Sequence, residues 1–259
     1  THLQRPIDAY VNAFYISPAD KEDIMKSFTT LKNYFSKTEL ILWSTSVVLI
    51  LIAFCLFDRT SYMTLWTSLI GVTSLIFCAK GNPMGQLLMV LFSLLYGMIS
   101  LNVSYYGEMI TYLGMTMPMA VFSLITWLKN PFNGNRSEVE IYHIKRHDIV
   151  LMSVLTAVVT ILFYFILKAF NTANLIPSTI SVTTSFLAVY LTFKRSPYYA
   201  AGYAANDLIL IILWTMASME DISCLSVTVC FAAFFVNDIY GFLNWRRMGQ
   251  RQAAVAAGS

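Results

Sequence analysis

Residues 149–170 read IVLMSVLTAVVTILFYFILKAF and contain a single charged residue, Lys168, close to the end of the run. A helix rises about 1.5 Å per residue, so this stretch is long enough to cross a hydrocarbon core of about 30 Å. Similar runs recur along the chain, which is 57% hydrophobic and only 12% charged and has a mean hydropathy of +0.63. Because soluble domains carry about 25% charged residues, the sequence predicts an all-α integral membrane protein.

Short polar breaks divide the apolar sequence into eight predicted transmembrane helices. Their approximate ranges are 40–57, 63–79, 86–104, 109–128, 149–170, 177–193, 198–219 and 222–245. Residues 1–38 precede them, and there Ser17-Pro18 is followed by apolar residues at helical spacing, which predicts an amphipathic helix on the membrane surface. We expect a polar loop at 129–148 and a tail at 249–259.

The basic residues are distributed unevenly between the two sides of the membrane in this arrangement. Of the 17 Lys and Arg residues, fifteen fall on the side of the N-terminus, and only Arg59 and Lys168 fall on the other. Positive charge accumulates on the cytoplasmic side, so both termini and the 129–148 loop are expected in the cytoplasm. The opposite surface is expected to carry acids, namely Asp58, Glu108, Glu220 and Asp221. The net charge of +3 is too small for a nucleic-acid-binding surface.

Two parts of the sequence match each other when the chain is shifted along itself. A shift of 118 residues places Tyr96 on Trp214 and Trp127 on Trp245. A shift of 114 places Lys80-Gly81-Asn82-Pro83 on Lys194-Arg195-Ser196-Pro197. These matches indicate an internal repeat, although general similarity between apolar helices is an alternative explanation.

The repeat predicts an architecture of two parallel three-helix bundles joined by a linker helix. The bundles would be residues 62–128 and 176–248, the linker 149–171, and 39–58 an extra N-terminal helix. Parallel repeats of this kind are typical of transporters, whose substrate binds near the midplane where the two repeats meet. Two alternatives lie outside the transporter class: a membrane receptor or scaffold without translocation, and an integral-membrane enzyme that acts on lipid.

Two polar doublets, Asn206-Asp207 and Asn237-Asp238, interrupt the last two apolar runs at matching depths. A carboxylate at the centre of a bilayer costs at least about 2.5 kcal/mol, so these residues favour a shared polar cavity. Packing between helices is the alternative for the asparagines. With their counterparts in the first bundle, the candidate substrate-binding residues are Gln86, Tyr96, Met117, Asn206, Asp207, Asn237, Asp238 and Tyr240.

Patterns that would indicate an enzyme or a bound cofactor are missing from the sequence. It contains no Gly-rich phosphate loop, no Gly-x-Ser-x-Gly and no His-Glu-x-x-His, and its four cysteines have no metal-binding spacing. We therefore expect no catalytic residues, no metal and no cofactor.

The sequence resembles the PnuC family of nicotinamide riboside transporters, which are relatives of the SWEET sugar carriers. The likeness covers about residues 63–248 and is carried by two stretches. One runs from Leu94-Leu95-Tyr96 through Tyr106-Gly107-Glu108 and Pro118-Met119 to Trp127, and the other from Asn237-Asp238-Ile239-Tyr240-Gly241 to Asn244-Trp245. The chain departs from the family pattern at Tyr199 and Gly202, where tryptophans are common, and at Ala120, where glutamine is common.

The resemblance implies uptake of nicotinamide riboside across a bacterial inner membrane. It also implies a homo-oligomer, namely a trimer as in related transporters. Nicotinamide riboside joins a cationic pyridinium to a ribose and an amide, which suit aromatic rings, a carboxylate and Asn or Gln side chains. Thiamine is also a cationic aromatic, so a related vitamin or nucleoside remains the alternative substrate.

Facilitated diffusion is the expected mode of transport. A proton relay needs titratable groups that reach both surfaces, and the outer halves of the helices offer only Tyr105, Tyr106 and Thr215 before the acids placed at the surface. Asp207 and Asp238 are therefore predicted to be a fixed negative lining, or partners of neighbouring hydrogen bonds. The resemblance also implies that a cytoplasmic kinase traps the imported product.

Overall fold

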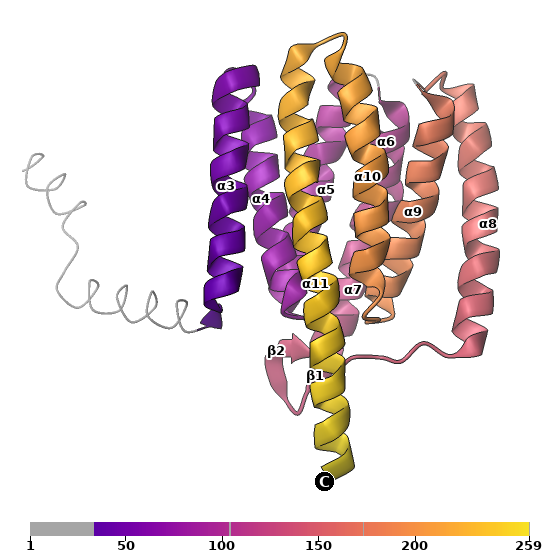
Figure 1. The fold of residues 1–259 in the computed structure, drawn as a ribbon. Helices are drawn as coiled ribbons and strands as arrows, with labels where there is room; N and C mark the ends of the chain where they lie inside the picture. The colour runs from indigo at the N-terminus through magenta and orange to yellow at the C-terminus, as the bar shows by residue number, and fades with distance from the viewer. Residues whose placement is uncertain (1–33, 104, 173, 259) are drawn as a thin grey trace, which may run out of the picture. The chain divides into compact units, whose positions relative to one another are not determined.

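The structure is a computed structural model that describes residues 34–103, 105–172 and 174–258. Within these ranges, eight helical spans are long and apolar enough to cross a membrane (Figure 1). The spans are α3 (Lys37–Phe57), α4 (Tyr62–Ala79), α5 (Pro83–Asn102), α6 (Tyr106–Thr111) continued by α7 (Met117–Lys129), α8 (Arg146–Ala169), α9 (Leu175–Phe193), α10 (Tyr199–Ser218) and α11 (Leu225–Gly258), which follows a short 3₁₀ turn at Ile222–Cys224. The predicted all-α membrane fold is confirmed.

The chain divides into two compact units, Thr1–Leu42 and Trp43–Ser259. In the first, α3 begins with a reciprocal cap in which Glu39 N donates to Ser36 Oγ at 3.2 Å and Ser36 N donates to Glu39 Oε2 at 2.7 Å. Such a capping box pairs backbone N–H groups that the first helical turn leaves without partners. The amphipathic helix predicted after Ser17-Pro18 falls almost wholly outside the described residues.

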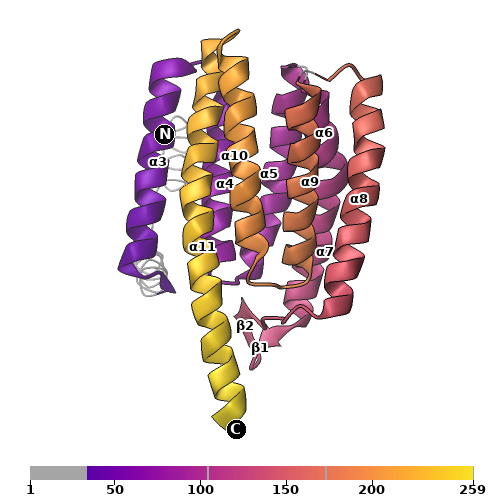
Figure 2. The same cartoon turned by 45° about the vertical axis from the view of Figure 1, so that its right-hand side comes forward.

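Six helices of the second unit pack in a closed ring. Helix α5 lies between α4 and α7, α10 lies between α9 and α11, and the two groups meet where α4 packs on α11 and α7 on α9. Helix α8 packs on α9 outside this ring, as Figures 1 and 2 show. The ring therefore places side chains from both groups of three helices around one common interior.

The turns that join α4 to α5 and α9 to α10 have the same backbone geometry. Gly81 and Arg195, which the 114-residue shift equates, both adopt left-handed φ angles, +68° and +56°. Gly81 N donates to Cys78 O and Arg195 N donates to Thr192 O, each at 2.9 Å. Glycine adopts this conformation without strain, whereas arginine at the equivalent position adopts it at some cost.

A β-hairpin lies within the segment predicted as a polar loop. Its strands, β1 (Pro131–Phe132) and β2 (Asn135–Val139), pair antiparallel. Asn133 and Gly134 connect them with positive φ angles of +48° and +77°, as a tight primed hairpin turn requires. Asn-Gly is the strongest short signal for such a turn, and the loop interpretation of 129–148 had not used it.

Helix α11 is much longer than the predicted span 222–245, because it continues without a break to Gly258. Residues 246–258 are rich in Ala, Arg and Gln, which are good helix formers. The segment expected to be a tail at 249–259 is thus helical as far as Gly258, and it runs beside the β-hairpin (Figure 1).

The fourth span changes its winding at its centre. Residues Tyr112–Thr116 form a π-helical turn between α6 and α7. Pro118 follows directly, and its missing N–H removes one hydrogen bond from the regular ladder. Such π-turns occur frequently at functional sites, and this one carries Tyr112 into the interior of the ring.

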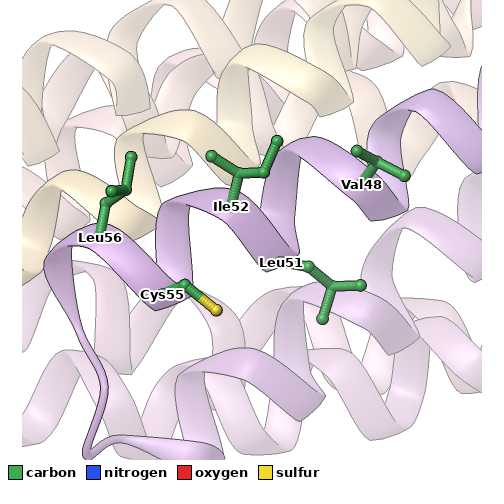
Figure 3. A pocket seen from close by; sticks show the side chains of 5 residues that line it. All are labelled: Val48, Leu51, Ile52, Cys55 and Leu56. Atoms are coloured by element: carbon green, nitrogen blue, oxygen red, sulfur yellow. The ribbon is translucent and has the colours of Figure 1, made fainter.

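Helix α3 carries a shallow depression on its exposed face (Figure 3). Val48, Leu51, Ile52, Cys55 and Leu56 line it, all from one helix. The lining is entirely apolar. A polar substrate needs placed hydrogen-bonding groups, so this surface suits lipid chains and is not the candidate site.

Candidate functional site

Two carboxyl groups meet inside the ring. Asp207 on α10 and Asp238 on α11 are each only 3% exposed, and their side chains hydrogen-bond to each other. A hydrogen bond between two carboxyls requires a proton on one of them, so the pair holds at most one negative charge. Among the described residues, Asp207 Oδ2 has no donor that hydrogen-bonds to it.

Asn206 joins α10 to α9. Its Oδ1 accepts hydrogen bonds from three hydroxyls of α9, those of Ser181 at 3.3 Å, Thr184 at 2.9 Å and Ser185 at 3.0 Å. Its side chain also hydrogen-bonds with the hydroxyl of Tyr112 on the π-turn. The carbonyl of this amide is therefore fully used within the protein.

Asn237 has an unused acceptor. Its Nδ2 donates to Ser46 Oγ at 2.9 Å and to Ala233 O at 2.8 Å. Its Oδ1 is buried and has no partner among the described residues. Because an unpaired buried acceptor costs about 1–3 kcal/mol, this oxygen is a natural contact point for a ligand hydroxyl or amide.

An aromatic cluster fills the interior on the side away from the hairpin. Trp214 Nε1 donates to Tyr96 Oη at 2.6 Å, so the two residues equated by the 118-residue shift contact each other. The Tyr112 ring lies 4.3 Å from that of Tyr96, and the Phe231 ring lies 5.3 Å from it, both edge-on. The cluster provides ring faces that would stack on a flat ligand or attract a cation.

A second aromatic group lies toward the hairpin and repeats the same symmetry. The rings of Trp127 and Trp245, equated by the same shift, are 5.3 Å apart. Trp127 Nε1 donates to Thr192 O at 3.0 Å, and Trp245 Nε1 donates to Cys78 O at 2.8 Å. Thr192 and Cys78 are themselves equated by the 114-residue shift, so each tryptophan contacts the other group of helices in the same way.

Glu108 does not lie at the outer surface, where the sequence analysis placed it. It is 1% exposed, and neither of its carboxyl oxygens has a partner among the described residues. The error arose because an acid in the first turn of a helix is a usual surface feature, whereas α6 packs against both α5 and α9. The helical spacing of Glu108, Thr111, Tyr112 and Thr116 was the signal of a buried polar face.

The other candidates lie around this interior in different environments. Gln86 is buried, and its Nε2 donates to Cys78 Sγ at 3.2 Å. Met117 and Tyr240 are only half-buried, the first at the start of α7 and the second two residues beyond Asp238. Asn244 serves packing, because its Nδ2 donates to Ala79 O at 2.8 Å.

The hairpin and the segment that follows it close one end of the ring. Val139 N donates to Gly81 O at 2.9 Å and Tyr142 N donates to Arg195 O at 3.1 Å, so one short segment, 139–142, holds both equivalent turns. Lys194 Nζ donates to Asp148 Oδ1 at 2.8 Å, and this hydrogen bond raises the pKa of the Lys194 ammonium. The Tyr142 hydroxyl also donates to Asp148, at 2.9 Å, which raises the pKa of Tyr142.

Similarity to known proteins agrees with this arrangement. The nicotinamide riboside transporter PnuC of Neisseria mucosa is 22% identical over 201 residues, which cover 76% of this chain and 76% of that protein. The nicotinamide riboside transporter PnuC of Haemophilus influenzae is 20% identical over 192 residues, covering 74% of this chain and 82% of that protein. A crystal structure of the vitamin B3 transporter PnuC has the same fold, with a TM-score of 0.74 at 19% identity over 84% of this chain and 94% of that one.

The family profile named nicotinamide mononucleotide transporter matches residues 61–247, which include five helices of the ring, most of α11 and both polar doublets. The chain belongs to this transporter family.

Proposed function

We propose that this protein carries nicotinamide riboside across a bacterial inner membrane by facilitated diffusion. One observation carries the proposal: every buried charged residue in the described part of the second unit is an acid. These residues are Asp58, Glu108, Asp148, Asp207 and Asp238. Three of them, Glu108, Asp207 and Asp238, belong to spans of the ring, and an interior lined by acids suits a cation.

The charge of the interior also separates two substrates that the names of the family and of its members suggest. Nicotinamide mononucleotide carries a phosphate, which proteins bind with Arg, Lys or helix N-termini. No Lys or Arg is buried among the described residues. The riboside lacks the phosphate and keeps the cationic pyridinium, so it is the favoured substrate.

The unpartnered polar atoms fit the remaining groups of this substrate. Asn237 Oδ1 and Asp207 Oδ2 are acceptors without partners, and the ribose hydroxyls and the carboxamide N–H groups are donors. The rings of Tyr96 and Tyr112 offer faces for the pyridinium. Gln86, Met117, Asn206, Asp238 and Tyr240 complete the proposed lining.

The packing supports the predicted pair of three-helix bundles. The groups α4, α5, α7 and α9, α10, α11 contact each other through equivalent tryptophans, as expected near a two-fold pseudo-symmetry axis. Substrate would bind on this axis, between the bundles. The predicted trimer is a further proposal that rests on the family resemblance, and light scattering of the detergent-solubilised protein tests it.

Orientation is tested by labelling exposed positions on opposite sides. Arg136 on the hairpin and Met219 after α10 are both exposed. In intact cells, a membrane-impermeant maleimide is expected to label Met219→Cys and not Arg136→Cys, because the charge distribution places the hairpin in the cytoplasm. Permeabilised cells should label both. Labelling of Arg136→Cys in intact cells would reverse the proposed orientation.

Substrate contact at Asn237 is tested by its replacement with leucine. The change removes the open acceptor Oδ1, so the Kd for nicotinamide riboside is expected to rise about ten- to a hundredfold, as for the loss of one buried hydrogen bond. Asn244→Leu is the matched control on the same helix and should leave the Kd unchanged. Binding to purified protein is measured by calorimetry, with thiamine as competitor. An unchanged Kd in folded Asn237→Leu would place the site elsewhere, and tighter binding of thiamine would favour the alternative substrate.

A further inference from the structure

Glu108 differs from the other buried acids of the described residues, because its carboxyl pairs with neither a cation, a backbone N–H nor another acid, and its one hydrogen-bonding neighbour is the Ser181 hydroxyl. Glu39 accepts a hydrogen bond from Ser36 N and Asp58 accepts one from Ser61 N. Asp148 pairs with Lys194, and the remaining two acids pair with each other. A buried charge without a partner is strongly unfavourable. A function that needs the carboxylate is the simplest reason for such a position.

The groups around Glu108 are two tyrosines and a serine hydroxyl, which are compatible with a bound cation. The carboxyl interacts electrostatically with the hydroxyls of Tyr96 and Tyr112, whose rings are 4.3 Å apart at 63°. The Ser181 hydroxyl lies beside it but donates to Asn206 Oδ1. No Lys, Arg or His is buried among the described residues, so a bound cation would be the buried charge partner of this carboxyl.

Glu108 is connected to the candidate binding residues through two contacts. Ser181 lies between the Glu108 carboxyl and Asn206. Tyr112 follows Glu108 one helical turn later on the same span, where the π-turn begins, and it hydrogen-bonds with Asn206. A ligand that reaches from Asn237 toward the aromatic cluster would therefore bring one end close to Glu108.

We propose that Glu108, together with the ring faces of Tyr96 and Tyr112, recognises the positive charge of the substrate's pyridinium ring. This inference rests on the proposed function and assigns the charge selectivity of the site to one residue. A carboxylate beside aromatic faces attracts an aromatic cation both by its charge and through the ring quadrupoles. Because of this contact, the protein carries a cation in preference to an uncharged molecule of the same shape.

The competing residues are Asp207 and Asp238, which the sequence analysis assigned as the negative lining. Their carboxyls share a hydrogen bond, so each acid has the other as its partner and the pair holds at most one charge, although Asp207 Oδ2 still lacks a donor. Glu108 has no such partner. The aspartates are therefore assigned to the polar layer that contacts hydroxyl and amide groups, and Glu108 to the charge.

The test compares the Kd of nicotinamide riboside with that of its reduced dihydropyridine analogue, which has the same ribose and amide and no charge. The unmodified protein is expected to bind the cation at least about tenfold more tightly. In Glu108→Gln the preference should fall close to one, through weaker binding of the cation and unchanged binding of the neutral analogue. Glu220→Gln makes the same change at an exposed position just after α10 and should keep the preference. Asp207→Asn, which alters the competing acid, should also keep the preference.

Each result decides the inference. Retention of the preference in Glu108→Gln, or its loss in Asp207→Asn, would overturn the assignment while leaving the proposed function intact. If the unmodified protein binds neither compound, the proposed function fails and the inference fails with it. Glu108→Asp, which retains the charge, is expected to keep the preference, and the thermal midpoint of substrate-free Glu108→Gln should not fall, since the variant removes an unpaired acid.

Discussion

Replacement of Asn206 with leucine is expected to abolish uptake and to lower the free energy of unfolding by roughly 3 kcal/mol or more. The Asn206 carbonyl is the acceptor for the hydroxyls of Ser181, Thr184 and Ser185. Leucine accepts none of these hydrogen bonds, and a buried polar group left unpaired costs about 1–3 kcal/mol. Thr184 also donates to backbone carbonyls of its own helix, which limits its share of the loss.

The effect at Asn206 is measured as the change in unfolding free energy in mixed micelles and as uptake by proteoliposomes. Asn102→Leu makes the same change at an exposed position at the end of α5 and is expected to alter both quantities little. A variant Asn206→Leu of unchanged stability would contradict the hydrogen bonding between α9 and α10. Normal uptake by that variant would remove Asn206 from the site.

The tryptophan pair is expected to give the second large effect. Trp127→Ala and Trp245→Ala should each lower the free energy of unfolding by about 3–5 kcal/mol, the usual cost of removing a buried tryptophan. Both side chains are fully buried, and each Nε1 donates to a backbone carbonyl of the other group of three helices. Since the rings are 5.3 Å apart, the double variant should cost less than the sum of the two single variants.

Trp66 provides the control for this pair, because it is 62% exposed on α4. Trp66→Ala is expected to change the unfolding free energy by less than about 1 kcal/mol. If one tryptophan proved essential and the other dispensable, the two-fold arrangement of the bundles would be contradicted. Additive costs would show that the two rings do not support each other.

The number and placement of the helices followed from the sequence, because an apolar run of membrane length can satisfy its backbone in lipid only as a helix. Seven of the predicted spans agree with the structure to within a few residues. The last predicted span ends too early. Hydropathy indicates where the membrane ends, whereas the helix-forming residues beyond it extend α11 to Gly258. The Asn133-Gly134 pair by itself predicts a hairpin turn, but the segment that contains it was predicted to be a loop because it is polar.

The site was less predictable, because hydrogen-bond partners depend on how each helix is rotated against its neighbours. The equal depth of Asp207 and Asp238 was visible in the sequence, but their mutual hydrogen bond was not. Nor did the sequence indicate that hydroxyls of α9 occupy the carbonyl of Asn206. Glu108 was misplaced because its position near a span boundary is compatible with either surface or interior, and only packing against α5 and α9 decides between them.

The burial of Glu108 also bears on the mode of transport. Facilitated diffusion was predicted because the sequence offered few titratable groups between Asp207 and the outer surface. The structure adds buried Glu108 to that region, together with Tyr105 and Tyr112. We retain facilitated diffusion because Asp207 and Asp238 bond to each other and Glu108 is assigned to the substrate cation. Uptake in an imposed proton gradient therefore distinguishes facilitated diffusion from proton-coupled transport.

The most direct measurement is the uptake of labelled nicotinamide riboside by proteoliposomes, with the membrane potential clamped and a pH gradient either imposed or absent. We expect saturable uptake that equilibrates the substrate across the membrane, at a level the pH gradient does not change. Uphill accumulation that collapses when the gradient is dissipated would contradict facilitated diffusion and make the buried acids coupling residues. Uptake no faster than in protein-free liposomes would contradict the central claim that this protein is a carrier.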